Sequence, residues 1–289
     1  MKNTNYERGQ IYLRMSYFNF NGKICKEETP IIGPSNRGLR YGDGLFETMK
    51  YEEGAIFFED EHFARLWKGM LFLQFDIPKN FTPLLLLQQI KALIKKNGLS
   101  GMVRIRLQVF RGSGGLYDAK NNLPNYIIQV WQLPNQHINS NGLVIGIYKE
   151  TRKTCDTISN LKHSNYLPYV LAALQAKKEK WNDAIVLNEK YRVCDTTMAN
   201  IFLIKEDIIY TPSLQEGCVA GIMRKNILQQ LALNGWQIKE TAITEEEIKN
   251  ADEVFLSNAI YNIRWVKQIE EVQYQNTNFQ KIYGQLFGG

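Results

Sequence analysis

Residues 161–166 read Leu-Lys-His-Ser-Asn-Tyr, and the expected fold rests on this stretch and on two others that follow it. Lys162 is followed 33 positions later by Asp195, within Val-Cys-Asp at residues 193–195. Residues 221–224 then read Gly-Ile-Met-Arg and begin an amphipathic run. Together the three segments supply a primary amine, a carboxylate, and a helix N-terminus whose backbone N–H groups suit an anion.

An amine that can form a Schiff base, a carboxylate and a phosphate site in one cleft are what a pyridoxal phosphate enzyme requires. Lys162 stands between Leu161 and the aromatic start of a predicted helix. Desolvation by apolar neighbours disfavours an ammonium ion and so frees the amine as a nucleophile and base. The competing interpretation is a solvated lysine at a helix start, and spacing alone favours it. Other motifs in the chain are therefore needed to distinguish a catalytic from a solvated Lys162.

Length and composition indicate a soluble globular protein. The chain has 289 residues, of which 44% are hydrophobic and 22% charged, which suits two domains of ordinary size. The N-terminal segment is polar where a signal peptide would be apolar. The most apolar run, residues 84–94, is interrupted by polar residues and is too short to span a bilayer. The sequence thus predicts a cytoplasmic protein without membrane contact.

The distribution of charged and metal-binding residues excludes several other classes. The four cysteines are widely separated and form no Cys-x-x-Cys pair, which argues against a disulfide framework or a zinc site. With only three histidines, a histidine-rich metal centre is not expected either, so no metal is predicted. The net charge of +6 is spread among glutamates rather than gathered in a basic stripe, which disfavours nucleic-acid binding. Attraction of an anionic substrate or cofactor explains the charge equally well.

The first half of the chain contains clear helix and strand patterns. Thr82-Pro83, an apolar run and then Asn97-Gly98 predict a helix with a capping residue, a proline at its first position and a glycine beyond its end. Residues 102–110 alternate strictly, with Arg104 and Arg106 on the polar side, and predict a strand. A second strand is predicted at residues 126–133.

A polar stretch at residues 134–142 is the best candidate for a linker. Beyond it, predicted strands alternate with helices: strands at 144–148, 184–187, 201–204, 208–210 and 254–256, and helices near 166–180, 222–233 and 245–250. This mixture on both sides of the linker predicts two α/β (α+β) domains, at residues 1–134 and 142–289. A cleft between them is the default site.

Two further motifs connect the chain to a known family. Residues 37–48 read Arg-Gly-Leu-Arg-Tyr-Gly-Asp-Gly-Leu-Phe-Glu-Thr and form a turn-rich entry into a strand. Residues 61–66, Glu-His-Phe-Ala-Arg-Leu, follow on a predicted helix with His62 and Arg65 on one face. With these motifs the chain resembles the class IV aminotransferase family, the fold type IV pyridoxal phosphate enzymes. This family includes branched-chain and D-amino-acid aminotransferases and aminodeoxychorismate lyase.

The resemblance runs from about residue 37 to residue 269. It implies a two-domain fold like that of D-amino-acid aminotransferases, with the cofactor, pyridoxal 5'-phosphate, in the interdomain cleft and the catalytic lysine in the C-terminal domain. It also implies a homodimer that acts on a small amino substrate.

The motifs assign cofactor roles by position. Lys162 resembles the catalytic lysine that bonds to the cofactor. Arg65, in a His-x-x-Arg-Leu pattern, resembles the arginine that grips the phosphate, a task that a planar guanidinium performs well. Ile222 and Met223 resemble the residues whose backbone N–H groups hold the phosphate at a helix start. Some relatives have threonine at the position of Met223, so one hydroxyl contact is missing here.

Four more residues take their roles from the resemblance. Asn258 matches the last phosphate-side position, and Tyr166 resembles a tyrosine that hydrogen-bonds to the phenolic oxygen of the cofactor. Tyr41 and Arg111 are the substrate-binding candidates. Arg111 begins the glycine-rich segment 111–117, whose competing interpretation is a plain hairpin connection.

Asp195 departs from the family pattern, which usually has glutamate there. The carboxylate at this position pairs with the pyridine nitrogen and keeps it protonated, so that the ring can take up electrons. Aspartate is shorter by one methylene, on the order of 1.5 Å of reach. We expect the role to be kept.

The motifs favour one family member. The Lys-His and Asn of residues 162–165, the Gly-Ile-Met-Arg of 221–224 and the Ser-Asn-Ala of 257–259 favour aminodeoxychorismate lyase, which releases pyruvate and leaves 4-aminobenzoate. Glu47 and Tyr166 are closer to the branched-chain or D-amino-acid aminotransferases, which remain the alternative. A remote alternative is an inactive relative that only binds the cofactor.

Overall fold

The computed structural model describes residues 4–7, 10–13, 16–134 and 141–288, and the chain divides into two compact units. The first unit comprises Met1–Gln136 together with Lys162–Asn165, and the second comprises His137–Leu161 and Tyr166–Gly289. The linker expected at residues 134–142 lies mostly outside the described residues. Lys162, expected in the C-terminal domain, is grouped with the first unit by its contacts.

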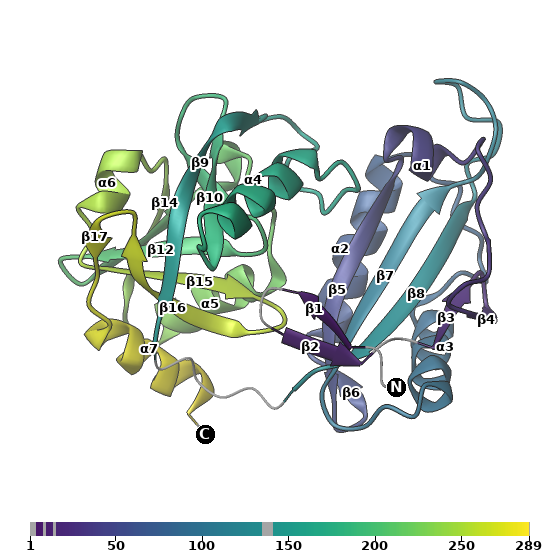
Figure 1. Ribbon diagram of the computed structural model, residues 1–289, viewed down its shortest axis with the longest axis horizontal. Helices are drawn as coiled ribbons and strands as arrows, with labels where there is room; N and C mark the ends of the chain where they lie inside the picture. Colours follow the sequence, from purple (N-terminus) through teal and green to yellow (C-terminus); the bar gives the residue numbers. More distant parts are fainter. Residues whose placement is uncertain (1–3, 8–9, 14–15, 135–140, 289) are drawn as a thin grey trace. The chain divides into compact units, whose positions relative to one another are not determined.

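The first unit is built on an antiparallel sheet with the strand order β4-β3-β8-β7-β5-β6 (Figure 1). Its elements are β1 (Thr4–Glu7), β2 (Gln10–Leu13), β3 (Tyr17–Phe20), β4 (Lys23–Lys26), α1 (Arg37–Tyr41), β5 (Gly44–Glu52), β6 (Ala55–Ile56), α2 (Glu59–Phe72), α3 (Pro83–Lys96), β7 (Val103–Arg111) and β8 (Pro124–Gln132). β1 and β2 pair separately as a two-stranded sheet.

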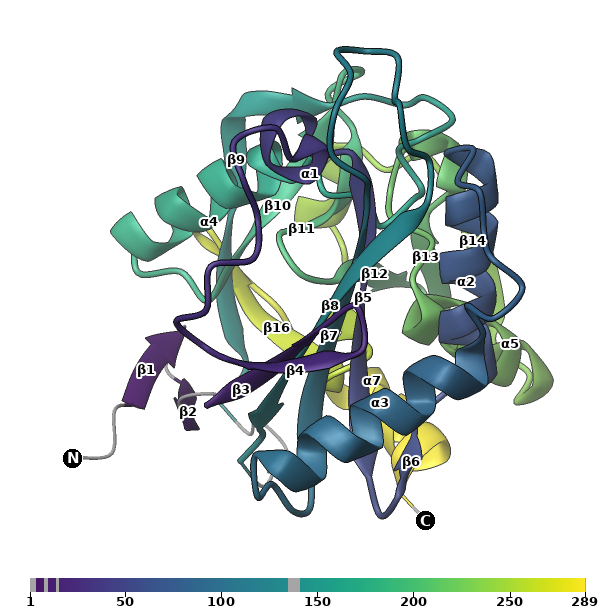
Figure 2. The same cartoon turned by 90° about the vertical axis from the view of Figure 1, so that its right-hand side faces the viewer.

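The two faces of this sheet differ in chemistry. Residues directly paired across strands share a face, and Glu47 pairs with Leu107, which pairs with Ile128. This face is mostly apolar, with Glu47 buried on it, and is covered by α2, against β5, and by α3, against β3 and β8 (Figure 2). The opposite face carries Phe46 and Arg106. The strict alternation expected for β7 is therefore confirmed.

The segment containing Lys162 adds a short stretch of pairing to β5. The Phe46 N–H donates to the Lys162 carbonyl over 2.8 Å, and the Ser164 N–H donates to the Gly44 carbonyl over 2.9 Å. Leu45 and His163 form an antiparallel bridge. Because β6 pairs only with the far end of β5, the beginning of β5 has an edge to which this segment can bind.

The second unit is built on a mixed sheet with the order β11-β10-β9-β16-β15-β12-β13-β14, and β17 pairs with β16. Its elements are β9 (Leu143–Lys153), α4 (Leu167–Lys178), β10 (Asp183–Asn188), β11 (Val193–Thr196), β12 (Asn200–Lys205), β13 (Ile208–Pro212), the 3-10 turn η1 (Leu214–Glu216), α5 (Ile222–Leu233), β14 (Gln237–Thr241), α6 (Glu245–Lys249), β15 (Glu253–Asn258), β16 (Asn262–Ile269), β17 (Val272–Gln273) and α7 (Thr277–Phe287).

This sheet curls around an apolar interior. β11 contacts β12 and β13 although those strands lie far from it in the strand order. Alternate residues of β9, β10, β12 and β15 share one buried cluster on the inner face. On the outer face, α4 packs on β9 and β10, while α5 and α7 pack near β15 (Figure 1).

Most of the predicted elements are confirmed. α3 begins with Thr82 as its N-cap and Pro83 in its first turn, and α5 spans the expected residues 222–233. The short helix α1 was not expected, because residues 37–48 read as a turn. No helix in the described part of the chain is long and apolar enough to cross a membrane. Within the same residues, no cluster of histidine, cysteine or acidic side chains is placed to hold a metal.

Candidate active site

Lys162 lies against an aromatic ring in the first unit. Its Nζ atom is 4.5 Å from the centre of the Phe46 ring, and Phe46 is held beside it by the backbone pairing of β5. The guanidinium of Arg106 lies 3.9 Å from the same ring centre. From the sequence, Arg106 was expected only to lie on the polar side of a strand. The structure places it on the same sheet face as Lys162, so an anionic substrate group near the amine would meet this arginine.

Arg65 is bound to a buried carboxylate. Its Nε donates to Glu47 Oε1 over 2.7 Å and its Nη2 to Oε2 over 2.6 Å, while His62 Nδ1 lies 2.7 Å from Oε2. Burial raises the pKa of Glu47, but the charge of Arg65 and the contact with His62 outweigh this and lower it to about 2. His62 and Arg65 thus lie on one face of α2, as predicted. Glu47 fixes the orientation of the arginine.

Asp195 lies on β11 and is 2% exposed. Its Oδ2 accepts hydrogen bonds from the Tyr169 hydroxyl and from the Val219 N–H, both over 3.0 Å. Its Oδ1 is buried and has no hydrogen-bond partner among the described residues. Burial raises the pKa of the carboxyl, and the nearby charge of Lys153 opposes this. An unpartnered buried oxygen of this kind is costly unless a ligand supplies a donor.

The N-terminus of α5 follows the loop that contacts Asp195. Gly221 is the N-cap residue, and no side chain caps the helix, so its first N–H groups are available to an anion. Ile222 and Met223 begin the helix, as expected. A Cβ at Gly221 would come within 2.0 Å of Asn200 Oδ1, so a larger residue here would have to displace the buried Asn200 side chain. The carboxylate and the helix start are therefore joined by residues 219–221.

These features fit pyridoxal phosphate. The pyridinium N–H of the cofactor is a donor of the kind that Asp195 Oδ1 lacks, and its phosphate suits the uncapped start of α5. The two observations lie within one unit. The unpartnered oxygen and the uncapped helix start are features of the structure and do not depend on the sequence motifs.

Tyr166 and Asn258 have contacts of their own. The Tyr166 ring lies 4.5 Å from that of Tyr169, the tyrosine that donates to Asp195. The Asn258 side chain accepts from the N–H groups of Ile260 and Tyr261 and donates to the Met198 carbonyl over 3.3 Å. Asn258 therefore holds the turn after β15, and any contact with a phosphate would be additional to this task.

Arg111 is 8% exposed, and the first unit engages most of its donors. Its Nε contacts Asp43, its Nη1 donates to Asn122 Oδ1 and to the Gln74 carbonyl, and its Nη2 donates to the Leu73 carbonyl. This geometry favours a structural role over the predicted contact with substrate.

Tyr41, the other substrate candidate, lies at the end of α1. Its ring is 5.7 Å from that of Tyr117, and the Arg37 guanidinium is 5.1 Å from its centre. Arg37 also pairs with Asp43 over 2.8 Å. Tyr41 thus packs against Tyr117 of the glycine-rich segment 111–117.

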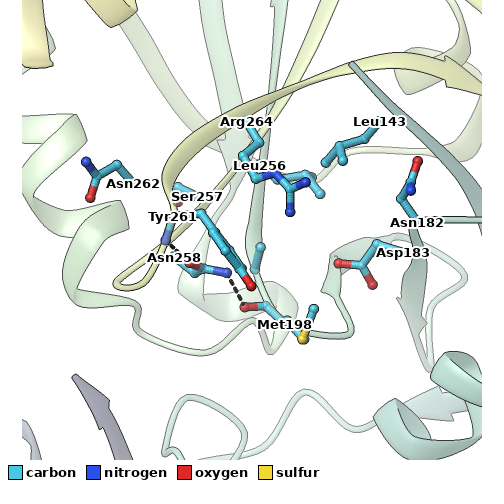
Figure 3. A pocket seen from close by; sticks show the side chains of 11 residues that line it. Leu143, Asn182, Asp183, Met198, Leu256, Ser257, Asn258, Tyr261, Asn262 and Arg264 are labelled. Carbon is cyan, nitrogen blue, oxygen red and sulfur yellow. Dashed lines mark hydrogen bonds between the residues drawn. The ribbon is translucent and has the colours of Figure 1, made fainter. Parts of the chain in front are cut away.

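A small pocket lies in the second unit beside Asn258 (Figure 3). It is lined by Leu143, Asn182, Asp183, Met198, Ala199, Leu256, Ser257, Asn258, Tyr261, Asn262 and Arg264. Its volume of about 20 Å³ suits a water molecule and not a cofactor. Neither Lys162 nor Asp195 lines it, so it is distinct from the predicted cofactor contacts of both residues.

Comparison with known proteins identifies the family. The family model for amino-transferase class IV matches residues 44–269, and the chain belongs to this family. It is a pyridoxal phosphate-dependent enzyme with the expected fold type IV architecture.

Similar proteins include members with different activities. The chain is 29% identical over 259 residues to aminodeoxychorismate lyase of Bacillus subtilis, covering 88% of this chain and 87% of that protein. It is also 29% identical over 253 residues to a putative branched-chain-amino-acid aminotransferase of Methanocaldococcus jannaschii, covering 86% of each. The crystal structure of a branched-chain aminotransferase from Thermoproteus uzoniensis superposes with a TM-score of 0.83 at 23% identity, covering 92% and 91% of the two chains, and shows the fold.

Proposed function

We propose that this chain is an aminodeoxychorismate lyase that releases pyruvate and leaves 4-aminobenzoate. The observation that supports its cofactor chemistry is the buried Asp195 oxygen without a partner, joined by residues 219–221 to the uncapped start of α5. The lyase assignment rests on the Lys-His and Asn at residues 162–165 and on the similarity to the Bacillus subtilis lyase.

In this proposal the residues that the sequence motifs name hold pyridoxal phosphate. Asp195 Oδ1 would accept the ring N–H, and Arg65 and the first N–H groups of α5, at Ile222 and Met223, would hold the phosphate. Tyr166 would hydrogen-bond to the phenolic oxygen. When bound, the cofactor supplies an electron sink that stabilises negative charge next to the substrate nitrogen.

Lys162 moves the proton. As a neutral amine it removes the hydrogen from the ring carbon that bears the substrate nitrogen. The C–O bond between the neighbouring ring carbon and the enolpyruvyl group then breaks and the ring becomes aromatic. Lys162 delivers the proton to the methylene carbon of the departing group, which becomes pyruvate. Elimination of this kind needs no second substrate.

Arg106 is the residue that we assign to a substrate carboxylate. Arg106 and Lys162 both contact the Phe46 ring, and Arg106 lies on the same face of the sheet as Phe46. Arg106→Leu should raise KM for aminodeoxychorismate by about ten- to a hundred-fold, the loss of one charge-assisted hydrogen bond. Arg104→Leu is the matched control, since Arg104 lies two residues earlier on the same strand and stacks on Trp131 instead. Equal effects of both substitutions would refute the assignment.

The second candidate function is transamination, which the similarity to the Methanocaldococcus jannaschii protein favours. Here Lys162 would return the proton to the cofactor instead, an oxo acid would leave, and a second oxo acid would be aminated. The two reactions differ in their substrates, because only transamination needs an amino donor and an oxo-acid acceptor.

Borohydride reduction tests the cofactor attachment. Reduction of the protein with bound cofactor, followed by peptide mass mapping, should place the adduct on the peptide that contains Lys162. Lys162→Ala should abolish the adduct, whereas the control Lys180→Ala, at an exposed lysine, should retain it. An adduct on another lysine, or none after reconstitution, refutes the assignment.

The choice of reaction is tested by supplying single substrates. Aminodeoxychorismate alone should yield equal amounts of 4-aminobenzoate and pyruvate. Single L- or D-amino acids should convert little of the bound cofactor to its aminated form. Rapid conversion by a branched-chain or D-amino acid, reversed by 2-oxoglutarate, would refute the lyase and establish the aminotransferase.

We also propose that the enzyme works in the cytoplasm as a homodimer. Its four cysteines are free, which suits a reducing compartment. One side of α4 exposes Leu167, Val170 and Leu174, which are 66%, 49% and 59% accessible in the single chain. Apolar side chains at this spacing form a stripe that a second copy could cover. Sedimentation should show a dimer that Leu167→Glu with Leu174→Glu dissociates, and a monomeric wild type would refute this.

A further inference from the structure

A buried lysine lies close to Asp195 in the second unit. Lys153, the last residue of β9, is 6% exposed, and its Nζ is 2.6 Å from the Tyr169 hydroxyl. The same Nζ is 3.9 Å from Asp195 Oδ2. Tyr169 lies on α4 and is 4% exposed. Three elements of the unit thus bring a cation, a phenol and a carboxylate together away from solvent.

The direction of the hydrogen bonds in this network follows from the chemistry of its members. A lysine ammonium has donors only, so Tyr169 accepts from Lys153 and its own proton points to Asp195 Oδ2. Burial raises the pKa of Tyr169 well above its ordinary value, with the Asp195 charge adding to this, so the phenol keeps that proton.

The Val219 N–H also donates to Oδ2. One oxygen of the carboxylate is therefore bound by fixed donors, and the other, Oδ1, is left for a ligand.

The network of Lys153, Tyr169 and Asp195 matters because aspartate is shorter than the glutamate that the family usually has at position 195. An aspartate cannot reach as far as a glutamate, so its carboxylate has to be held at one angle for Oδ1 to meet a ring nitrogen. A buried carboxylate also needs a positive charge nearby to stay ionised. Lys153 supplies the charge, and through Tyr169 it supplies the orientation.

We propose that Lys153 is a positioning residue that acts through Tyr169 on Asp195 and strengthens the contact of Oδ1 with the cofactor ring nitrogen. This inference rests on the proposed role of Asp195. Because Lys153 would act through Tyr169 and Asp195, its effect should depend on whether the bound ring contains a nitrogen.

The test compares two ligands on the apoprotein. Pyridoxal phosphate and 1-deazapyridoxal phosphate share the phosphate and the aldehyde, but the second has carbon in place of the ring nitrogen. The wild type should bind pyridoxal phosphate more tightly than the deaza compound. Lys153→Met should weaken binding of pyridoxal phosphate by about tenfold and leave the deaza compound within about twofold. Lys153→Arg should restore most of the preference.

Other outcomes would overturn the proposal. Equal weakening of both ligands by Lys153→Met would show that Lys153 only supports the fold, and no change in either would show that it has no role. Tyr169→Phe serves as a second variant if Lys153→Met does not fold, and it too should reduce the preference selectively. A wild type without any preference would refute the Asp195 contact and this inference with it, while borohydride labelling of Lys162 would still support the proposed function. A wild type that binds neither ligand would refute both.

Discussion

Glu47→Gln tests whether the buried pair with Arg65 makes the stability of the protein depend on pH. The pKa of Glu47 is lowered from the ordinary 4.5 to about 2, because the Arg65 charge and the His62 contact outweigh the effect of burial. A carboxyl whose folded pKa is lowered stabilises the protein above pH 4.5, and this stabilisation is lost as the pH falls from 4.5 toward 2. The full difference is worth about 3 kcal/mol, of which about 2 kcal/mol is lost between pH 7 and pH 3.

Urea unfolding of the apoprotein at pH 7 and at pH 3 measures this loss. Between the two pH values, the free energy of unfolding of the wild type should fall by about 2 kcal/mol more than that of Glu47→Gln. The control Glu53→Gln removes an exposed carboxylate in the turn after β5 and should follow the wild type. If Glu47→Gln shows the same pH dependence as the wild type, the argument from the buried pair is refuted.

Three further predictions concern the cofactor site and the fold. In a Glu47→Gln background, where no buried carboxylate is left unpaired, Arg65→Ala should weaken pyridoxal phosphate binding by about ten- to a hundred-fold in a fluorescence titration. Asp195→Asn should retain the cofactor yet lower kcat by at least about tenfold in steady-state assays, because an amide does not keep the ring nitrogen protonated. Gly284→Ala should raise the free energy of unfolding by up to about 1 kcal/mol, since Gly284 lies within α7 and a Cβ there meets no atom within 4 Å.

Local patterns predicted those parts of the fold that depend on neighbours in the sequence. α3 and α5 could be bounded because capping residues and helical spacing act within a few residues. β7 could be recognised because its alternation reflects one covered face. The pairing of the Lys162 segment with β5 could not be predicted, because its partners are more than a hundred residues apart and no local pattern encodes such a contact. The same reason explains why the sequence could not show that residues 162–165 pack with the first unit.

A sequence motif can indicate a candidate residue, but the contacts of that residue in the structure determine whether it is free to bind a ligand. Arg106 lies in the middle of β7 and Arg111 ends it, and the motif favoured Arg111. Most N–H donors of Arg111 are hydrogen-bonded within the first unit. Arg106 instead lies beside the Phe46 ring, which Lys162 also contacts. Strand alternation could have raised Arg106 as a candidate, because its side chain shares a face with Phe46.

Lys153 shows the opposite case, a functional candidate without any motif. It ends a charged stretch, Lys-Glu-Thr-Arg-Lys at residues 149–153, that reads as a solvated strand end. Only the fold shows that it is buried beside a carboxylate. A buried charge costs free energy unless it is paired, so its placement there calls for a partner that benefits from it. Asp195 is that partner, because donors hold one of its oxygens and leave the other unsatisfied, as the hydrogen bond that we propose from the ring N–H requires.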